Sequence, residues 1–221
     1  MKKVLVGMSG GVDSSVSAYI LKEKGYDVCG ITLDLLDKSN LGAINDAKSV
    51  AEKLGIKHIV LNLSQDFRKN IINYFVSEYQ NGKTPNPCVM CNKKIKFGLL
   101  LEYALKNGFD YVATGHYANI FYDKNLDRWL LKKSEAAKDQ SYFLYKLGQS
   151  QLSHILFPLG DYQKSYVREI AKKLELPVAE KSESQDICFI PGGNHTEFIV
   201  NNMENKLSFG NFIDKQGNIL G

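Results

Sequence analysis

The chain has 221 residues, of which 44% are hydrophobic and 24% are charged, and its formal net charge is +4. This length allows one large domain or one domain with a smaller companion, and the charge permits nucleic-acid binding without requiring it. No apolar run is long enough for a transmembrane helix, and charges interrupt the first apolar stretch, so we expect no signal peptide, no membrane partner and a cytoplasmic location.

Strand and helix patterns alternate through the first half of the chain. In order, they predict strand 2–8, helix 14–24, strand 28–35, helix 43–54, strand 56–63 and helix 66–79. Such alternation predicts an α/β fold, with a doubly wound parallel sheet that has helices on both faces. Ligands of these sheets bind beyond the carboxyl ends of the strands.

The first predicted strand leads into the glycine-rich segment Ser9-Gly10-Gly11-Val12-Asp13-Ser14-Ser15. Adjacent glycines let a ligand approach the main chain, and the first N–H groups of the following helix lack partners and favour an anion. The segment therefore predicts a phosphate cradle. It is neither a Walker A loop nor a dinucleotide fingerprint, and a glycine-rich turn that binds nothing is the simpler alternative.

The segment 82–92, which reads GKTPNPCVMCN, interrupts the alternation. We expect an extended loop, because two prolines disfavour a helix, and a helix over 95–106. Cys88 and Cys91 would lie at the start of that helix, where a thiolate is stabilised. Half of a zinc site is the alternative, but no second pair of ligands at zinc-binding spacing follows. The chain has four cysteines, which indicates catalytic or metal-binding thiols in a reducing compartment.

The second half of the chain is less regular. A predicted strand over 109–113 ends in Thr114-Gly115-His116, where Gly115 would let backbone approach a nucleotide and His116 is either a site residue or a structural hydrogen-bonding group. Further on we expect a hairpin of 120–122 and 129–132, a helix that opens at 138–140, and helices over 150–157 and 164–174. Towards the end of the sequence we expect a strand-like run over 183–190, a turn at 191–193 and a helix over 197–203. The first strand and turn of a hairpin are expected over 210–220. The basic side chains of helix 164–174 either face a nucleic acid or form a solvated face.

The glycine-rich segment resembles the PP-loop of ATP pyrophosphatases, which split ATP between its α and β phosphates. Together with TPNPCVMCNKKIKFG, ATGHYA, KDQSYFL, LFPLGDYQKSYVREIA and SESQDICFIPGG, it makes the chain resemble the bacterial tRNA-specific 2-thiouridylases from residue 2 to the end. The resemblance implies a PP-loop (adenine nucleotide α-hydrolase-like) domain over 1–145, a small, mainly helical tRNA-binding region over 146–205, and the start of a C-terminal β domain over 206–221. Family members continue into a β-barrel, so we expect either a fragment or a short lineage.

The resemblance also implies the site residues. ATP would bind to Gly7, Met8, Ser9, Gly10, Gly11, Val12, Asp13 and Ser14, with Leu33 near the adenine and Gly115 completing the site. Cys91 would be the nucleophile and Cys188 the persulfide carrier. The target base would meet Asn86, Pro87 and Cys88, and the tRNA would contact Lys138, Asp139 and Gln140.

The implied reaction replaces the 2-oxygen of the wobble uridine of tRNA with sulfur. ATP would adenylate the oxygen, with Mg²⁺ expected on the phosphates, and the sulfur would come from a persulfide on Cys188. The implied partners are the wobble-uridine tRNAs for Lys, Glu and Gln and a persulfide donor such as a cysteine desulfurase or a relay protein.

Cys88 departs from the family pattern, since many relatives carry aspartate there. With Cys91 and Cys188 it could ligate a [4Fe–4S] cluster that binds sulfide, or it could be a spare thiol beside a persulfide pair. Two other functions stay open. An amide-forming PP-loop synthetase that acts on a small metabolite would not need the two cysteines, and an inactive tRNA-binding fragment would not release pyrophosphate.

Overall fold

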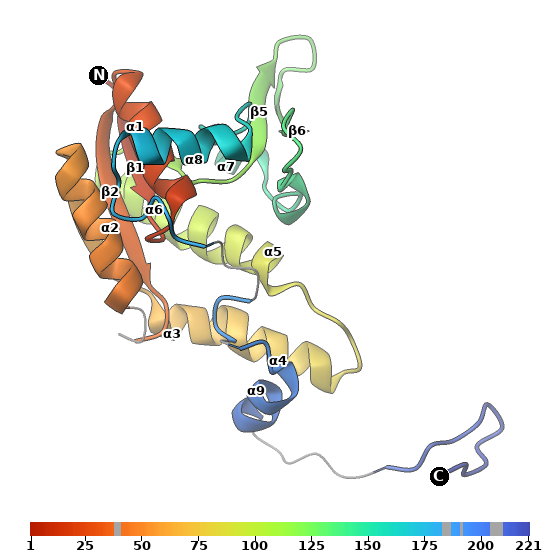
Figure 1. Ribbon diagram of the computed structural model, residues 1–221. Coiled ribbons are helices and arrows are strands. Elements are labelled where there is room, and N and C mark those ends of the chain that lie inside the picture. The colour runs from red at the N-terminus through yellow and green to blue at the C-terminus, as the bar shows by residue number, and fades with distance from the viewer. Residues whose placement is uncertain (38–40, 183–186, 191, 204–209) are drawn as a thin grey trace.

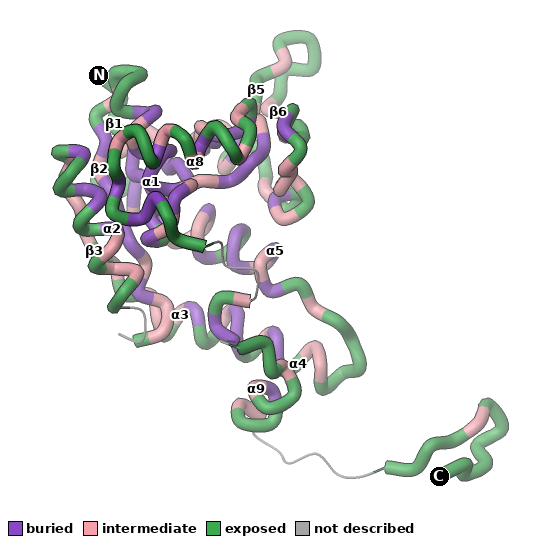
Figure 2. Tube along the Cα trace, in the orientation of Figure 1, coloured by how far each residue is buried: buried purple, intermediate pink, exposed green. Residues whose placement is uncertain are grey.

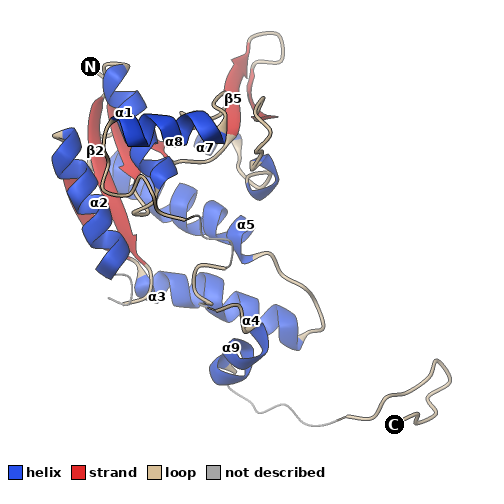
Figure 3. Ribbon diagram, in the orientation of Figure 1, coloured by secondary structure: helices blue, strands red, loops and turns tan. Residues whose placement is uncertain are grey.

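A five-stranded parallel sheet forms the centre of the fold (Figures 1 and 3). The computed structural model describes residues 1–37, 41–182, 187–190, 192–203 and 210–221. The strands are β3 (Lys57–Asn62), β2 (Asp27–Asp34), β1 (Lys3–Gly7), β4 (Tyr111–Ala113) and β7 (Ile155–Leu156), in that spatial order. The strand order changes direction at β1, so the carboxyl ends of β1 and β4 form the switch point where such sheets bind ligands.

Helices cover both faces of this sheet. They are α1 (Val12–Glu23), α2 (Leu41–Leu54) and α8 (Lys164–Lys173) on one face, and η2 (Asn92–Leu99) and α6 (Leu100–Lys106) on the other. Val4 and Val6 of β1 point into the first layer and Leu5 into the second, because successive strand residues alternate between faces. Figure 2 shows the buried positions along the strands and the inner helix faces. The predicted α/β fold with a parallel sheet is confirmed.

A third apolar cluster lies beyond the sheet, where α9 packs beside α4 (Figure 1). The helical stretch consists of α3 (Ser64–Phe67), the π-helical segment η1 (Arg68–Ile72) and α4 (Asn73–Gln80), and α9 covers His195–Asn202. The ring of Phe189 lies 5.6 Å from that of Phe67 and 5.3 Å from that of Phe198. These contacts anchor residues 187–190 against the helical stretch. The predicted helices over 66–79 and 197–203 are confirmed, with shifted ends.

A helix begins inside the segment that was expected to be an extended loop. Pro87–Cys91 form α5, which continues into the π-helical η2. Pro87 occupies the first helical position, where the missing N–H costs nothing, and the Asn86 side chain caps the helix by accepting from the N–H groups of Cys88 at 3.1 Å and Val89 at 3.3 Å. The expectation was therefore wrong for 87–92, because proline disfavours a helix interior but not a helix start.

Three other predicted elements differ from the structure. The helix expected over 150–157 is shorter, since α7 covers Gln149–Leu152 and β7 follows and pairs with β4. The helix that was expected to open at 138–140 is only the 3₁₀ turn η3 (Ser141–Phe143). In the run over 183–190 that was expected to be a strand, the described residues 187–190 form a turn, in which Ile190 N–H donates to Ile187 O at 2.8 Å. Residues 183–186 and 191 lie outside the described residues. Short apolar runs do not reveal their structure by periodicity, so the neighbouring strand decides.

The hairpin is confirmed as β5 (Ala118–Asp123) and β6 (Arg128–Lys133), which pair antiparallel with Tyr122 opposite Trp129. Two elements of the region 146–205 join the sheet layers, because β7 extends the sheet and α8 packs on α1. Over 210–221 the chain folds back on itself, and a single antiparallel bridge pairs Ile213 with Ile219 at the position of the expected hairpin. Among the described residues, no helix is long and apolar enough to cross a membrane.

Candidate active site

The phosphate loop (Gly7–Ser14) connects β1 to α1 at the switch point. The Ser14 hydroxyl accepts from the backbone N–H of Ser9 at 3.1 Å and donates to the Gly11 carbonyl at 3.1 Å. No described side chain caps α1, so the first N–H groups of the helix are left for an anion. The loop thus has the geometry of the predicted phosphate cradle.

Two glycines allow close approach at this loop. Gly10 has φ +69°, and a Cβ there would lie 2.4 Å from the Ala43 carbonyl oxygen of α2. A Cβ on Gly115, at the end of β4, would lie 2.8 Å from the Asp13 carbonyl carbon. The structure therefore brings Gly115 against the loop, as expected for a residue that completes the nucleotide site.

Neighbouring groups hold the loop and its edge in place. The Thr32 hydroxyl donates to the Met8 carbonyl at 2.9 Å, and Met8 N–H donates to Ile31 O at 2.7 Å. Leu33 follows near the carboxyl end of β2 and packs between two apolar clusters. On the other side, Lys181 Nζ donates to the Gly10 carbonyl at 2.9 Å, a contact that the sequence did not predict.

The Asp13 carboxylate gathers residues that are far apart in sequence. Its Oδ1 accepts from Lys164 Nζ at 2.5 Å and from the Tyr117 hydroxyl at 2.9 Å. Lys138 Nζ lies 4.0 Å from Oδ2, and both ammonium groups lie over the Tyr117 ring. Sequence reasoning placed Lys164 on a helix that faces either a nucleic acid or solvent, and it did not single out Tyr117.

The segment 138–140 is held in place by hydrogen bonds to residues outside it. Gln140 pairs with Tyr117 in both directions, since Tyr117 N–H donates to Gln140 Oε1 at 3.1 Å and Gln140 N–H donates to Tyr117 O at 2.8 Å. The Asp139 carboxylate accepts from Ser134 N–H and from Ser141. Burial would raise the pKa of Asp139, but these hydrogen bonds outweigh it and lower the pKa. These two side chains therefore order the segment, and Lys138 is left to reach the loop.

Three thiols meet in one region. Cys88 and Cys91 lie on α5, and Cys91 belongs to the same apolar cluster as Phe189, the neighbour of Cys188. Burial is the main cause that raises the pKa of Cys91, and ionisation of Cys188 or Cys88 would raise it further, because the three thiols are close together. Cys29 lies on β2, and all four cysteines are free thiols. The structure therefore brings together the three cysteines that the resemblance selected.

The expectation of stabilised thiolates is wrong for this conformation. Burial raises the pKa of Cys91 to about 12, and it also raises the pKa values of Cys88 and Cys188, although Cys188 as a residue is exposed. The Lys96 charge, on η2, lowers the pKa of all three thiols but does not offset the loss of water. Sequence reasoning missed Lys96, whose only signal was its position five residues after Cys91 in a wide helical turn.

The thiols do not form a metal site as they stand. Among the described residues, no group of three or more His, Cys, Asp or Glu side chains has an arrangement that could hold a metal ion. Of the two alternatives for Cys88, the [4Fe–4S] ligand set does not fit this arrangement of Cys88, Cys91 and Cys188, and we derive no step through a cluster.

Two buried polar residues flank the thiols and the loop. His116 is packed against Phe97 and Phe157, its Nδ1 lies 2.7 Å from the Thr114 hydroxyl, and burial holds its pKa well below the usual value. This geometry favours the structural alternative for His116. Asn92 Oδ1 is buried and has no partner among the described residues, an arrangement that costs about 1–3 kcal/mol and marks a polar position beside Cys91.

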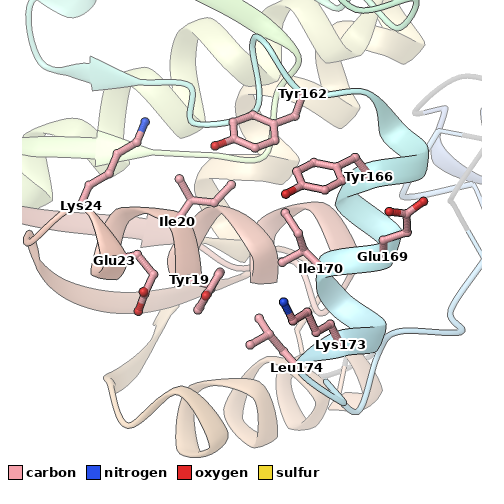
Figure 4. A pocket seen from close by; sticks show the side chains of 10 residues that line it. All are labelled: Tyr19, Ile20, Glu23, Lys24, Tyr162, Tyr166, Glu169, Ile170, Lys173 and Leu174. Carbon is pink, nitrogen blue, oxygen red and sulfur yellow. The ribbon is translucent and has the colours of Figure 1, made fainter.

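A groove of about 570 Å³ runs between α1 and α8 (Figure 4). Its walls carry the stacked rings of Tyr162 and Tyr166, whose centroids are 6.0 Å apart, and charged side chains from both helices also line it: Glu23 and Lys24 from the α1 side, and Glu169 and Lys173 from α8. No residue of the phosphate loop lines this groove, so it is separate from the candidate active site.

Comparison with curated proteins gives close relatives. The tRNA-specific 2-thiouridylase MnmA 2 of Clostridium botulinum (strain Okra / Type B1) is 53% identical over 232 aligned residues, covering 100% of this chain and 65% of the relative. The protein of the same name from Clostridium tetani is also 53% identical, with 64% of its length covered. The chain thus spans about 65% of the length of these relatives.

Solved structures with the same fold are more distant in sequence. A 4-thiouridine synthetase in complex with RNA and ATP is 17% identical, with a TM-score of 0.56 over 85% of this chain and 45% of that one. A glutamine-dependent NAD⁺ synthetase from Acinetobacter baumannii, in complex with ADP, is 17% identical, with a TM-score of 0.51 over 83% of this chain and 32% of that one. At this identity the similarity concerns the fold alone. The sequence model of one family, described as the tRNA methyl transferase HUP domain, matches residues 2–192, and the chain therefore belongs to this family.

Proposed function

We propose that this chain carries the ATP-binding and sulfur-transfer site of a tRNA-specific 2-thiouridylase. The observation that carries the proposal is the phosphate loop at the switch point of the sheet, in a chain whose packing also brings Cys88, Cys91 and Cys188 into one region. The 53% identity to proteins named tRNA-specific 2-thiouridylase supports the substrate class.

ATP binds with its phosphates on the loop residues Gly7–Ser14. Gly115, whose Cα lies against the loop, lets the nucleotide contact main chain, and Leu33 supplies an apolar surface for the adenine. The nucleotide adenylates the 2-oxygen of uracil and releases pyrophosphate. Mg²⁺ is commonly held by one carboxylate together with substrate phosphates, and Asp13 is the carboxylate on this loop.

Sulfur transfer uses the two cysteines. A donor of persulfide sulfur, such as a cysteine desulfurase or a relay protein, leaves an S–SH group on Cys188. The Cys91 thiolate attacks the Cys188 Sγ, the S–S bond of the persulfide breaks, and its electron pair leaves with hydrosulfide. Hydrosulfide then displaces AMP from C2 of the base, and an external thiol must reduce the Cys91–Cys188 disulfide. Direct attack by the persulfide on the base is the other route.

The tRNA meets the site along two segments. Asn86, Pro87 and Cys88 at the start of α5 lie next to the nucleophile and contact the target base, and Lys138, Asp139 and Gln140 contact the tRNA. The substrates are the wobble-uridine tRNAs for Lys, Glu and Gln, and the enzyme acts in the cytoplasm, where these tRNAs are. The name of the curated relatives, tRNA-specific 2-thiouridylase, supports tRNA as the substrate class.

The test is to measure the nucleotide products and the modified tRNA together. With tRNA, ATP, Mg²⁺ and a persulfide donor, the protein should release AMP and pyrophosphate and form 2-thiouridine. Cys91→Ser and Cys188→Ser should abolish 2-thiouridine, and Cys29→Ser, on β2, serves as the matched control that keeps it.

Three results would contradict the proposal. Release of ADP and phosphate would reject the PP-loop chemistry. Full thiolation by Cys188→Ser with a protein-borne donor would reject the persulfide carrier. Activity on a small metabolite that survives both cysteine changes would point to an amide-forming synthetase.

A further inference from the structure

Two lysines from distant parts of the chain converge on the phosphate loop. Lys164 is the first residue of α8 and lies 151 positions from Asp13, yet its Nζ is 2.5 Å from Asp13 Oδ1. Lys138, from the segment after β6, places its Nζ 4.0 Å from Oδ2 of the same carboxylate. Neither lysine belongs to the glycine-rich segment that sequence reasoning assigned to ATP.

The aromatic ring of Tyr117 fixes where these ammonium groups lie. Tyr117 is fully buried, and its hydroxyl donates to the same Asp13 oxygen at 2.9 Å. The Nζ atoms of Lys138 and Lys164 lie 5.1 and 6.0 Å from the ring centroid. Because Tyr117 directly follows the Gly115-His116 pair at the end of β4, the ring holds both cations at the ligand-binding edge of the sheet.

A purely structural ion pair explains this arrangement less well than a ligand site does. The side chains of Asp13, Lys138 and Lys164 remain 24%, 28% and 20% exposed, and pairs that are reached by solvent contribute little to stability. Two lysines on one carboxylate at the mouth of an anion-binding loop are instead what a polyphosphate requires. The loop N–H groups can bind one phosphate, whereas the others need further cationic donors, and lysine is a common phosphate ligand.

We propose that Lys164 and Lys138 form a polyphosphate subsite beside the phosphate loop, which binds the two terminal phosphates of ATP and the pyrophosphate that leaves. In the free protein the two ammonium groups interact with the Asp13 carboxylate, and phosphate oxygens take its place when the nucleotide binds. This inference rests on the proposed ATP-binding function. It places Lys138, which is also proposed to contact the tRNA, beside the phosphates of the nucleotide.

The test compares ligands that have and lack the terminal phosphates. Calorimetry on the whole chain should give the affinities of ATP, inorganic pyrophosphate and AMP for the unchanged protein, Lys164→Gln, Lys164→Arg and Lys172→Gln. Lys164→Gln should weaken ATP and pyrophosphate at least tenfold and leave AMP within about twofold, and Lys164→Arg should restore most of the loss. Lys172→Gln is the matched control, because Lys172 lies on the same helix but pairs with Glu180 at the surface.

A second variant separates the lysine from the ion pair. Asp13→Asn breaks the pair but keeps both lysines, so with EDTA present it should still bind pyrophosphate, at least as tightly as the unchanged protein. Equal loss of ATP and AMP in Lys164→Gln, unchanged ATP binding in that variant, or loss of pyrophosphate in Asp13→Asn would each overturn the subsite. If the unchanged protein binds no ATP with or without Mg²⁺, the proposed function itself fails, and this result is distinct from the other three.

Discussion

The phosphate loop and the thiol region are built in opposite ways. The loop consists of consecutive residues, and some of its hydrogen bonds are local, such as those of Ser14 with Ser9 and Gly11. The thiol region combines α5 with a turn about one hundred residues later, and packing around Phe189 joins them. The residues that offer N–H groups to an anion are therefore neighbours in sequence, whereas the thiol region depends on packing of the third apolar cluster.

The two regions also differ in how accessible their functional groups are to a ligand or to water. The loop leaves the first N–H groups of α1 without a capping side chain, so they can bind an anion. The thiols are held in the protonated state, because burial raises the pKa of Cys91 to about 12. A buried thiol is protected from oxidation but is a poor nucleophile. We expect sulfur transfer to require a movement that hydrates Cys91, whereas ATP binding should not.

The largest effect should come from Gly10→Ala in the loop. The new methyl group would meet the Ala43 carbonyl at 2.4 Å, and the φ of +69° is strained for alanine, so ATP affinity should fall by more than tenfold. Gly42→Ala is the matched control, because nothing lies within 4 Å of a Cβ there. ATP titration measures both, and equal affinities would mean that the loop is less fixed than its contacts indicate.

Alkylation of Cys91 should show a different pH dependence from that of an ordinary thiol. With a pKa of about 12, the thiolate fraction of Cys91 should rise about tenfold per pH unit from about pH 7 to about pH 11. An unburied thiol would level off above about pH 9. Mass spectrometry of the iodoacetamide-labelled peptide measures the rate. A plateau near pH 9 would show that the thiol region opens to water on its own.

The smallest effect should come from the cap of α5. Asn86→Ala removes the acceptor of two backbone N–H groups and should lower the free energy of unfolding by about 1 kcal/mol. Asn86→Asp keeps an acceptor and should restore it. Urea unfolding of the three proteins gives the comparison. If Asn86→Asp keeps stability but loses tRNA thiolation, Asn86 also contacts the base, as the proposed function states.

Much of the fold was predictable because its signals are local. The strands, the helices of the first half and the phosphate loop follow from periodicity and from glycine chemistry within short windows. The errors fall where a distant partner decides the structure. Ile155 and Leu156 form a strand because Val112 and Ala113 offer a parallel edge, and Gln140 stays out of a helix because it pairs with Tyr117.

The candidate residues for the chemistry, and their order along the chain, could be read from sequence alone: the phosphate loop, the Cys88–Cys91 pair and Cys188. Only the tertiary structure decided their environment. Packing placed Lys164, on a helix that could face either a nucleic acid or solvent, at the Asp13 carboxylate, and it placed Lys96 near three thiols whose pKa values burial raises. The physical reason is that motifs depend on neighbours in sequence, whereas charge pairing and loss of water depend on neighbours in space.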